Sequence, residues 1–124
     1  MAETAALFTM AGVSKRYGGV RALDKVDLAV APARVHAILG ENGAGKSTLI
    51  KIMAGVVAPD EGRMTLGGRE VSFASPAAAN EAGIVCIFQE LSLIPDLSVA
   101  DNIAISDPPR RFGLIDRRRQ RAIA

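Results

Sequence analysis

One segment of the sequence carries residues of the types and at the spacing that bind phosphate. Residues 40–47 read Gly-Glu-Asn-Gly-Ala-Gly-Lys-Ser and match the pattern G-x-x-x-x-G-K-[ST] in full. Glycines allow the backbone to curl until successive N–H groups point inward at phosphate oxygens. The Lys46 ammonium would add a full positive charge at the β- and γ-phosphates, and the Ser47 hydroxyl is an oxygen ligand suited to Mg²⁺. The chemistry predicted here is therefore the binding of a nucleoside triphosphate with its magnesium ion.

The flanks of this loop are the elements that a phosphate-binding loop needs. Residues 35–39 form an apolar run typical of a strand covered on both faces. Residues 47–53 predict a helix, whose N-terminus would face phosphate with its partial positive charge. A glycine-rich turn with an exposed lysine is the alternative, but a chance match to the four fixed positions occurs only about once in 10⁴ to 10⁵ windows. The predicted nucleotide-binding residues of the loop are Gly40, Glu41, Asn42, Gly43, Ala44, Gly45, Lys46, Ser47 and Thr48.

Strands and helices are expected on both sides of the motif, which indicates an α/β fold. Two glycines at 67–68 predict a hairpin turn, and helices are expected to begin after the capping residues Ser75 and Ser98. Residues 14–19 read as a loop or turn. Besides 35–39, strands are expected over residues 7–13, 26–30, 63–66, 70–73 and 84–88.

Composition and charge exclude several classes of protein. The single cysteine excludes a disulfide scaffold, and no apolar run reaches the roughly 18 residues that a membrane span needs. Residues 1–109 hold nine basic and twelve acidic residues, whereas residues 110–124 hold six arginines and one aspartate. Because the basic balance belongs to this last segment, it predicts a solvated helix start and disfavours nucleic acid as a partner. Contact with nucleic acid or anionic lipid is the alternative interpretation of the arginines.

The motif and its surroundings resemble the nucleotide-binding domain of ABC transporters. The resemblance is carried by residues 40–55 and by the turn at 59–62, and it covers about residues 5–120. It implies a P-loop NTPase core of the ABC ATPase type, in which a mixed sheet carries the phosphate loop beside an antiparallel β part. It also implies ATP and Mg²⁺ as cofactors.

Two further residues lie where that family has functional side chains. Tyr17 resembles the aromatic A-loop residue that stacks on adenine, because a π face suits that contact. Gln89 resembles the Q-loop glutamine, which contacts Mg²⁺ and the attacking water. The resemblance therefore implies catalytic roles for Lys46 and Gln89, and Mg²⁺ contacts for Ser47 and Gln89.

A narrower resemblance points to the cargo. Residues 67–76, 89–103 and 113–116 are similar to the ATP-binding subunits of bacterial monosaccharide importers of the ribose, galactose and xylose type. This implies three partners: a transmembrane permease, a periplasmic sugar-binding protein and a second ATP-binding domain. It also implies a place at the cytoplasmic face of the cell membrane, held by the permease. Importers of nucleosides or of autoinducer-2 are the related alternatives.

The sequence departs from the family in what it lacks. Residues 1–124 contain no Leu-Ser-Gly-Gly-Gln signature, no Walker B strand ending in Asp-Glu and no switch histidine. We therefore expect residues 1–124 to be the N-terminal portion of one nucleotide-binding domain, incomplete in its fold. The intact protein would be an ATP-hydrolysing transporter subunit, and this chain alone would be inactive. A non-hydrolysing nucleotide-binding fragment and an inert fragment are the alternatives; a small P-loop kinase is disfavoured, because no acceptor site or lid is recognisable.

Overall fold

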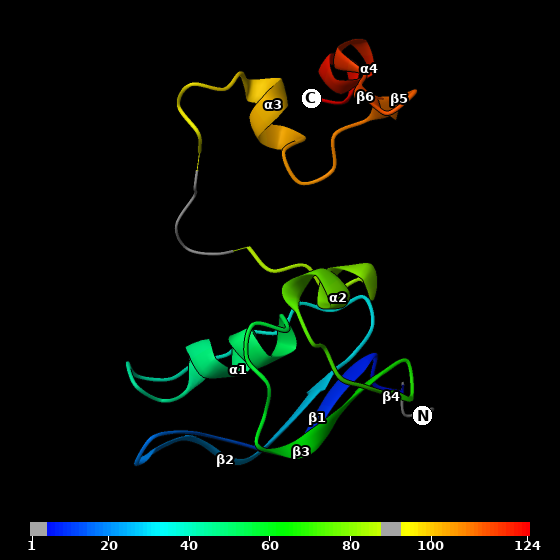
Figure 1. The fold of residues 1–124 in the computed structure, drawn as a ribbon. Coiled ribbons are helices and arrows are strands. Elements are labelled where there is room, and N and C mark those ends of the chain that lie inside the picture. Colours follow the sequence, from blue (N-terminus) through cyan, green and yellow to red (C-terminus); the bar gives the residue numbers. More distant parts are fainter. Residues whose placement is uncertain (1–4, 88–92) are drawn as a thin grey trace. The chain divides into compact units, whose positions relative to one another are not determined.

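The computed structural model describes residues 5–87 and 93–124 of the 124-residue chain. The chain divides into two compact units, an N-terminal unit of residues 1–87 and a C-terminal unit of residues 88–124 (Figure 1). Each unit has its own strands and helices.

An antiparallel sheet forms one layer of the N-terminal unit. Its four strands lie in the order β2-β1-β3-β4, and every neighbouring pair is antiparallel. The predicted turn at 67–68 is confirmed, since it joins the last two strands. The strands are β1 (Phe8–Tyr17), β2 (Val20–Val30), β3 (Glu61–Leu66) and β4 (Arg69–Val71).

The prediction of a loop or turn over residues 14–19 is wrong for residues 14–17, which belong to β1. β1 continues to Tyr17, which pairs with Val20 across a two-residue turn. The strand continues because its polar groups find partners on both sides. The Ser14 hydroxyl accepts the Lys25 backbone N–H at 2.9 Å, and the Asp60 carboxylate accepts the Arg16 backbone N–H at 2.7 Å. Strand β1 thus brings Tyr17 to the end of a long hairpin.

Two helices cover one face of this sheet (Figure 1). They are α1 (Lys46–Met53) and α2 (Pro76–Glu81); α2 begins where the sequence predicts, and α1 begins one residue before the predicted start at Ser47. The Ser75 hydroxyl caps α2 by accepting the Ala78 N–H at 3.2 Å. The core between sheet and helices consists of Phe8, Met10, Val13, Leu23, Leu49, Ile52, Met64, Phe73 and Ala79.

The predicted strands at 35–39 and 84–88 are not formed in the part of the chain that the structure describes. Residues 35–39 and 84–87 belong to no strand, and Phe88 lies outside the described residues. Val35 is 100% exposed and Leu39 is 89% exposed. An apolar run becomes a buried strand only when neighbouring strands pair with it, and no described strand pairs with these runs. The apolar pattern indicates residues suited to a buried strand, but it does not tell whether other strands of the chain lie beside them.

The described residues 93–124 of the C-terminal unit form two short helices and a small hairpin. Ser98 caps its first helix as predicted: the hydroxyl accepts the Asp101 N–H at 3.2 Å and donates to the Asp101 carboxylate at 2.6 Å. The Gln120 side-chain amide donates to Ala100 O at 3.1 Å and to Asp101 Oδ1 at 2.9 Å, which ties the two helices together. The elements are α3 (Val99–Ile103), β5 (Arg110–Arg111), β6 (Leu114–Ile115) and α4 (Arg117–Ile123).

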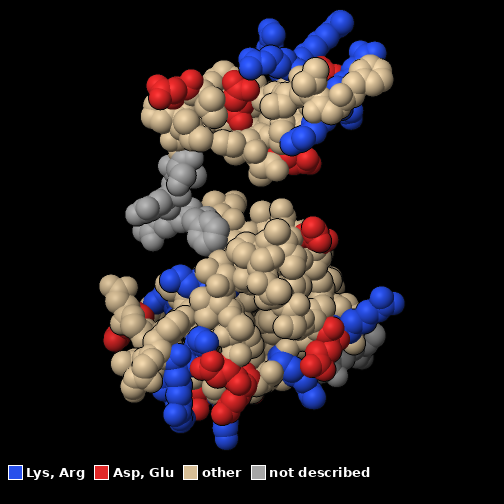
Figure 2. All heavy atoms as spheres, in the orientation of Figure 1, with Lys and Arg blue, Asp and Glu red and all other residues tan. Residues whose placement is uncertain are grey.

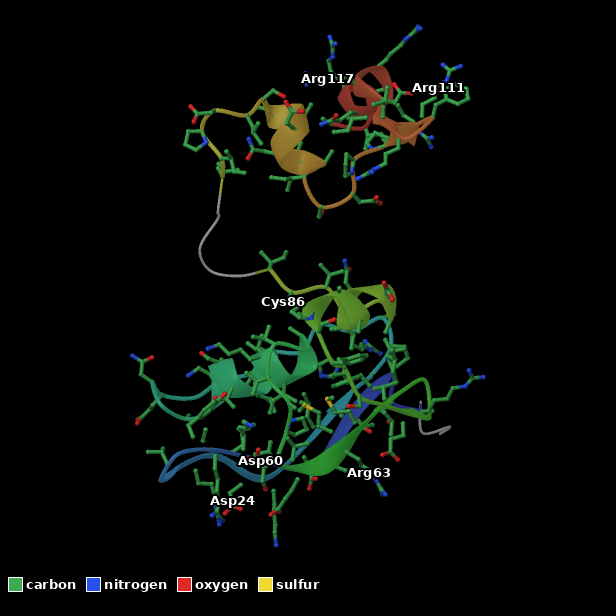
Figure 3. The ribbon with its side chains drawn as sticks, viewed as in Figure 1. Asp24, Asp60, Arg63, Cys86, Arg111 and Arg117 are labelled. Atoms are coloured by element: carbon green, nitrogen blue, oxygen red, sulfur yellow. The ribbon has the colours of Figure 1, made fainter. Side chains whose placement is uncertain are left out.

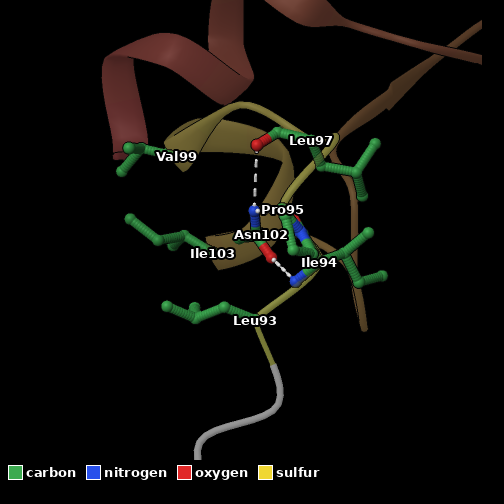
Figure 4. Close-up of a pocket in the computed structure, with 7 residues that line it drawn as sticks. All are labelled: Leu93, Ile94, Pro95, Leu97, Val99, Asn102 and Ile103. Atoms are coloured by element: carbon green, nitrogen blue, oxygen red, sulfur yellow. Dashed lines mark hydrogen bonds between the residues drawn. The ribbon is translucent and has the colours of Figure 1, made fainter.

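An apolar cavity of about 410 Å³ lies beside α3 (Figure 4). The Asn102 side chain holds its loop in place, because it accepts the Ile94 N–H at 2.8 Å and donates to Leu97 O at 3.2 Å. The lining residues are Leu93, Ile94, Pro95, Leu97, Val99, Asn102 and Ile103.

Within the described residues, no helix has both the length and the apolar character that crossing a bilayer requires.

The docking of α1 on the sheet gives a prediction about stability. Ile52 is 1% exposed, so Ile52→Ala should lower the free energy of unfolding by about 2–5 kcal/mol through lost contacts and the cavity left behind. Ile50 lies on the same helix but is 43% exposed, and Ile50→Ala should change it by no more than about 1 kcal/mol. Urea titration followed by circular dichroism measures both. Equal effects of the two substitutions would contradict this packing of α1.

The Asp60 carboxylate gives a prediction about pH. It accepts a hydrogen bond from the Lys15 ammonium at 2.8 Å and one from the Arg16 N–H, and these hold the pKa of Asp60 below its ordinary value of 3.8. A carboxyl group with a lowered pKa in the folded state stabilises the fold above its unfolded pKa, and this stabilisation is lost as the pH falls through the folded pKa. Asp60→Asn should therefore lower the free energy of unfolding at pH 7. It should also make the fall of this free energy below about pH 4 less steep. Thermal melts across this range test it, and an unchanged acid slope in the variant would refute the assignment.

Candidate functional site

The phosphate-loop motif adopts a tight turn before helix α1. The Ala44 N–H donates to Glu41 O at 3.1 Å, and the Leu49 N–H donates to Gly45 O at 2.9 Å, which starts the helical ladder. The Lys46 ammonium folds back over the loop, donating to Gly40 O and, at 2.8 Å, to Glu41 O. The lysine charge is thus held at the inside of the turn.

Gly45 is the point where the loop contacts the sheet. Its φ is +91°, a conformation that L side chains rarely adopt. A Cβ atom at this position would lie 2.6 Å from Ala22 O and 2.7 Å from Leu23 Cδ2. Only glycine therefore allows the loop to approach β2 this closely, and the approach fixes where α1 begins.

The N-terminus of α1 is open to an anion. Its N-cap is Gly45, which provides no side-chain cap, and the first turn contains no acidic residue. The first N–H groups of a helix have no partner within the helix, so those of Lys46, Ser47 and Thr48 point outward with partial positive charge. The hydroxyls of Ser47 and Thr48 lie in this same first turn.

A cavity of about 290 Å³ joins the loop to the β1–β2 hairpin. Its loop side is formed by six of the nine predicted residues: Asn42, Gly43, Gly45, Lys46, Ser47 and Thr48. Gly40 and Glu41 contribute through the carbonyl groups that hold Lys46, and Ala44 lies at the turn. The lining combines backbone N–H groups, two hydroxyls and an ammonium, a donor set that fits phosphate oxygens.

Three residues that sequence reasoning missed line the other side of this cavity. They are Val20, Arg21 and Ala22, the first residues of β2. The signal that could have found them is the pair Gly18-Gly19, because a two-residue hairpin turn there returns the chain directly into a strand. The Arg21 guanidinium pairs with the Asp24 carboxylate at 2.8 Å.

Tyr17 lies directly across the hairpin from a residue that lines the cavity. Its Cα partner across the hairpin is Val20, and Tyr17 is 46% exposed. The Lys15 ammonium lies 5.7 Å from the centroid of its ring. The hairpin thus presents a partly exposed aromatic ring on the residue that pairs with Val20, which lines the cavity.

The other predicted contact, Gln89, lies outside the described residues 5–87 and 93–124. Among the residues described, no group of three or more histidine, cysteine, aspartate or glutamate side chains gathers as a metal site would require. Beside the phosphate loop, the described part of the chain offers the hydroxyls of Ser47 and Thr48 as oxygen ligands. One or two protein ligands are usual where Mg²⁺ is bound mainly through phosphates and water.

Comparison with known proteins identifies the family. The sequence profile described as ABC transporter matches residues 23–124. The ribose import ATP-binding protein RbsA 1 of Mesorhizobium japonicum is 79% identical over 118 residues, which cover 95% of this chain and 23% of that protein. The arabinose import ATP-binding protein AraG of Azospirillum brasilense is 50% identical over 112 residues, covering 90% of this chain and 22% of the relative. The chain thus spans about a quarter of the length of the curated relatives that it matches.

Solved structures show the same fold. A nucleotide-free ATP-binding cassette from an ABC transporter is 32% identical, with a TM-score of 0.75 over 82% of this chain and 40% of that one. An ATP-binding cassette of an ABC transporter in its ADP conformation is 35% identical, with a TM-score of 0.63 over 66% of this chain and 32% of that one. The predicted fold class, an incomplete α/β core of the ABC ATPase type, is confirmed. From its phosphate loop, its fold and the match over residues 23–124, the chain belongs to the ABC transporter family.

Proposed function

We propose that this chain binds ATP with Mg²⁺ and forms the first part of the ATPase subunit of a bacterial ribose-type importer. The observation that carries the proposal is the cavity at the open N-terminus of α1, where Lys46, Ser47 and Thr48 face the hairpin residues Val20–Ala22. The names of the relatives support a monosaccharide as the cargo of the whole protein, and ribose before arabinose by their identities of 79% and 50%.

The geometry supports a role for each group in binding. The Lys46 ammonium would exchange its two carbonyl acceptors for oxygens of the β- and γ-phosphates, which are stronger acceptors because they are charged. The first N–H groups of α1 would bind phosphate oxygens, and the Ser47 hydroxyl would take a place in the Mg²⁺ shell. Tyr17 would stack on the adenine from the end of the hairpin. Bound Mg²⁺ neutralises phosphate charge and so assists phosphoryl transfer.

Gln89 is part of the same proposal. From its place after the run 84–88 it would contact Mg²⁺ and orient the attacking water. Together with Lys46 it would form the catalytic contribution of this chain. The ABC family resemblance supports this role.

The exposed apolar runs support the view that residues 1–124 are the N-terminal portion of one nucleotide-binding domain. Val35 and Leu39 directly precede the phosphate loop, and Val85 and Ile87 are 73% and 88% exposed. Apolar runs of this kind are typical of strands buried in the middle of a sheet. Strands from a longer polypeptide, of the length that the relatives have, would pair with them. The whole protein would then act with a permease, a periplasmic sugar-binding protein and a second ATP-binding domain at the cytoplasmic face of the membrane.

The binding part of the proposal is tested by calorimetric titration of the chain with MgATP. Lys46→Ala should weaken binding about 10- to 100-fold, since it removes a charge-assisted contact to the phosphates. The matched control is Lys51→Ala, which removes the same charge from the exposed side of the same helix and should leave the affinity within about twofold.

One result would contradict the proposed binding site, and a second would contradict the expectation that the isolated chain is inactive. Equal affinities of the Lys46→Ala and Lys51→Ala chains would mean that the phosphate loop is not the binding site. Mg²⁺-dependent turnover of ATP by the isolated chain, abolished by Lys46→Ala, would overturn the expectation that hydrolysis needs the signature segment and the Walker B glutamate.

A further inference from the structure

The arginines that the sequence gathers near residue 124 form one surface of the C-terminal unit together with an apolar hairpin tip. All six arginines are exposed, and they lie on β5 and α4: Arg110, Arg111, Arg117, Arg118, Arg119 and Arg121. Figure 2 shows their positive charge gathered over this end of the unit, and Figure 3 marks Arg111 and Arg117 there. We call the exposed residues 110–121 the basic hairpin surface.

The tip of the hairpin is apolar and exposed. Phe112 is 93% exposed and Leu114 is 75% exposed, while Ile115 is 52% exposed at the base of the same hairpin. The Arg111 guanidinium carbon lies 5.4 Å from the centroid of the Phe112 ring, so cation and ring are adjacent. Isolated exposed apolar residues are ordinary, but an aromatic tip set among arginines is the composition of surfaces that enter the membrane interface.

The backbone at the tip is strained for the residue that it carries. Phe112 has a φ of +52° and Gly113 a φ of +81°, the left-handed conformations of a two-residue hairpin turn. Asparagine, aspartate and glycine are the residues that accept such a turn readily, whereas a bulky aromatic residue does so at an energetic cost. Since the ring gains almost no burial among the described residues 93–124, packing within this unit does not explain its place. A strained, exposed aromatic residue is grounds for a functional hypothesis.

The carboxylate within this surface already accepts hydrogen bonds from the backbone. Asp116 is the acidic residue of the segment, and its carboxylate caps α4 by accepting the Arg118 N–H at 3.2 Å and the Arg119 N–H at 3.0 Å. None of the six arginines forms an ion pair with a described residue, because the two ion pairs found in the described ranges are Lys15–Asp60 and Arg21–Asp24. Asp101 lines a cavity together with Arg117 and Arg121 and so offsets part of their charge, but the six arginines still give the surface a net positive charge.

We propose that the basic hairpin surface docks directly on an anionic lipid bilayer. Phe112 and Leu114 enter the interface between headgroups and acyl chains, and the arginines contact the anionic headgroups while their alkyl stems lie along the apolar boundary. A bilayer explains both features of the surface, its charge and its apolar tip. Nucleic acid would explain the charge alone, because Phe112 is the single aromatic residue of the segment and single strands are bound by successive stacked rings. This contact is independent of nucleotide binding at Lys46.

The experiment is co-sedimentation of the full 124-residue chain with vesicles, without nucleotide. We expect binding to vesicles of phosphatidylcholine with phosphatidylglycerol, little binding to phosphatidylcholine alone, and a decline as salt rises, since the attraction falls off within a Debye length. Phe112→Asn should weaken the partitioning about tenfold. Asparagine suits the left-handed turn better than phenylalanine, so this loss cannot be ascribed to misfolding.

The contribution of the arginine charges to vesicle binding is tested with a matched pair of double variants. The double variant Arg110→Gln, Arg111→Gln should weaken binding about 25-fold, at about fivefold for each arginine near an anionic surface. The control Arg63→Gln, Arg69→Gln removes the same charge from exposed positions of β3 and β4 and should leave binding unchanged.

Three outcomes would overturn the proposal. The first is no binding to the anionic vesicles at low salt. The second is equal weakening by the two double variants, which would mean that only net charge matters. The third is tighter binding to a single-stranded or duplex oligonucleotide than to vesicles at the same salt, with no effect of Phe112→Asn. Because no nucleotide is used, none of these results depends on whether the chain binds ATP.

Discussion

The close approach of Gly45 to β2 is the constraint on which the candidate site depends. With 2.6 Å between the Gly45 Cβ position and Ala22 O, the loop has no room for any side chain there. This contact sets the start of α1, and the buried side chains Leu49 and Ile52 then hold the helix on the sheet. As a result, the open helix N-terminus, the lysine and the β1–β2 hairpin share one cavity.

The hairpin in turn depends on polar contacts that are distant in sequence. Asp60 lies 44 positions from Arg16, yet its carboxylate accepts the Arg16 N–H and its own N–H donates to Ser14 O at 2.9 Å. These contacts keep the end of β1 ordered as a strand up to Tyr17. The proposed adenine contact is therefore positioned by the same sheet that receives α1, and the proposed membrane contact belongs to a separate unit with its own capping network.

The sequence predicted well where the information lies within a few residues. The phosphate loop, the turn at Gly67-Gly68 and the caps at Ser75 and Ser98 are local patterns, and the structure has each of them. Prediction from the sequence failed where the structure depends on partners that are distant in sequence. The extension of β1 needs Asp60, the lining by Val20–Ala22 needs the hairpin, and the apolar runs 35–39 and 84–87 would need strands that the described residues do not provide. Local propensity predicts an element, but only tertiary context decides whether it pairs.

The most direct test of the Gly45 contact is a carbon-edited NOESY spectrum of the isotope-labelled chain. Since the Gly45 Cβ position lies 2.7 Å from Leu23 Cδ2, a Gly45 Hα proton should give a strong cross-peak to a Leu23 δ-methyl group. Cross-peaks among the side chains of the core cluster, to which Met10 and Ile52 belong, serve as the internal standard for a folded sample. We expect the Gly45–Leu23 cross-peak to be present together with these core signals. Its absence while the core signals are present would contradict the claim that the phosphate loop is positioned by its contact with β2.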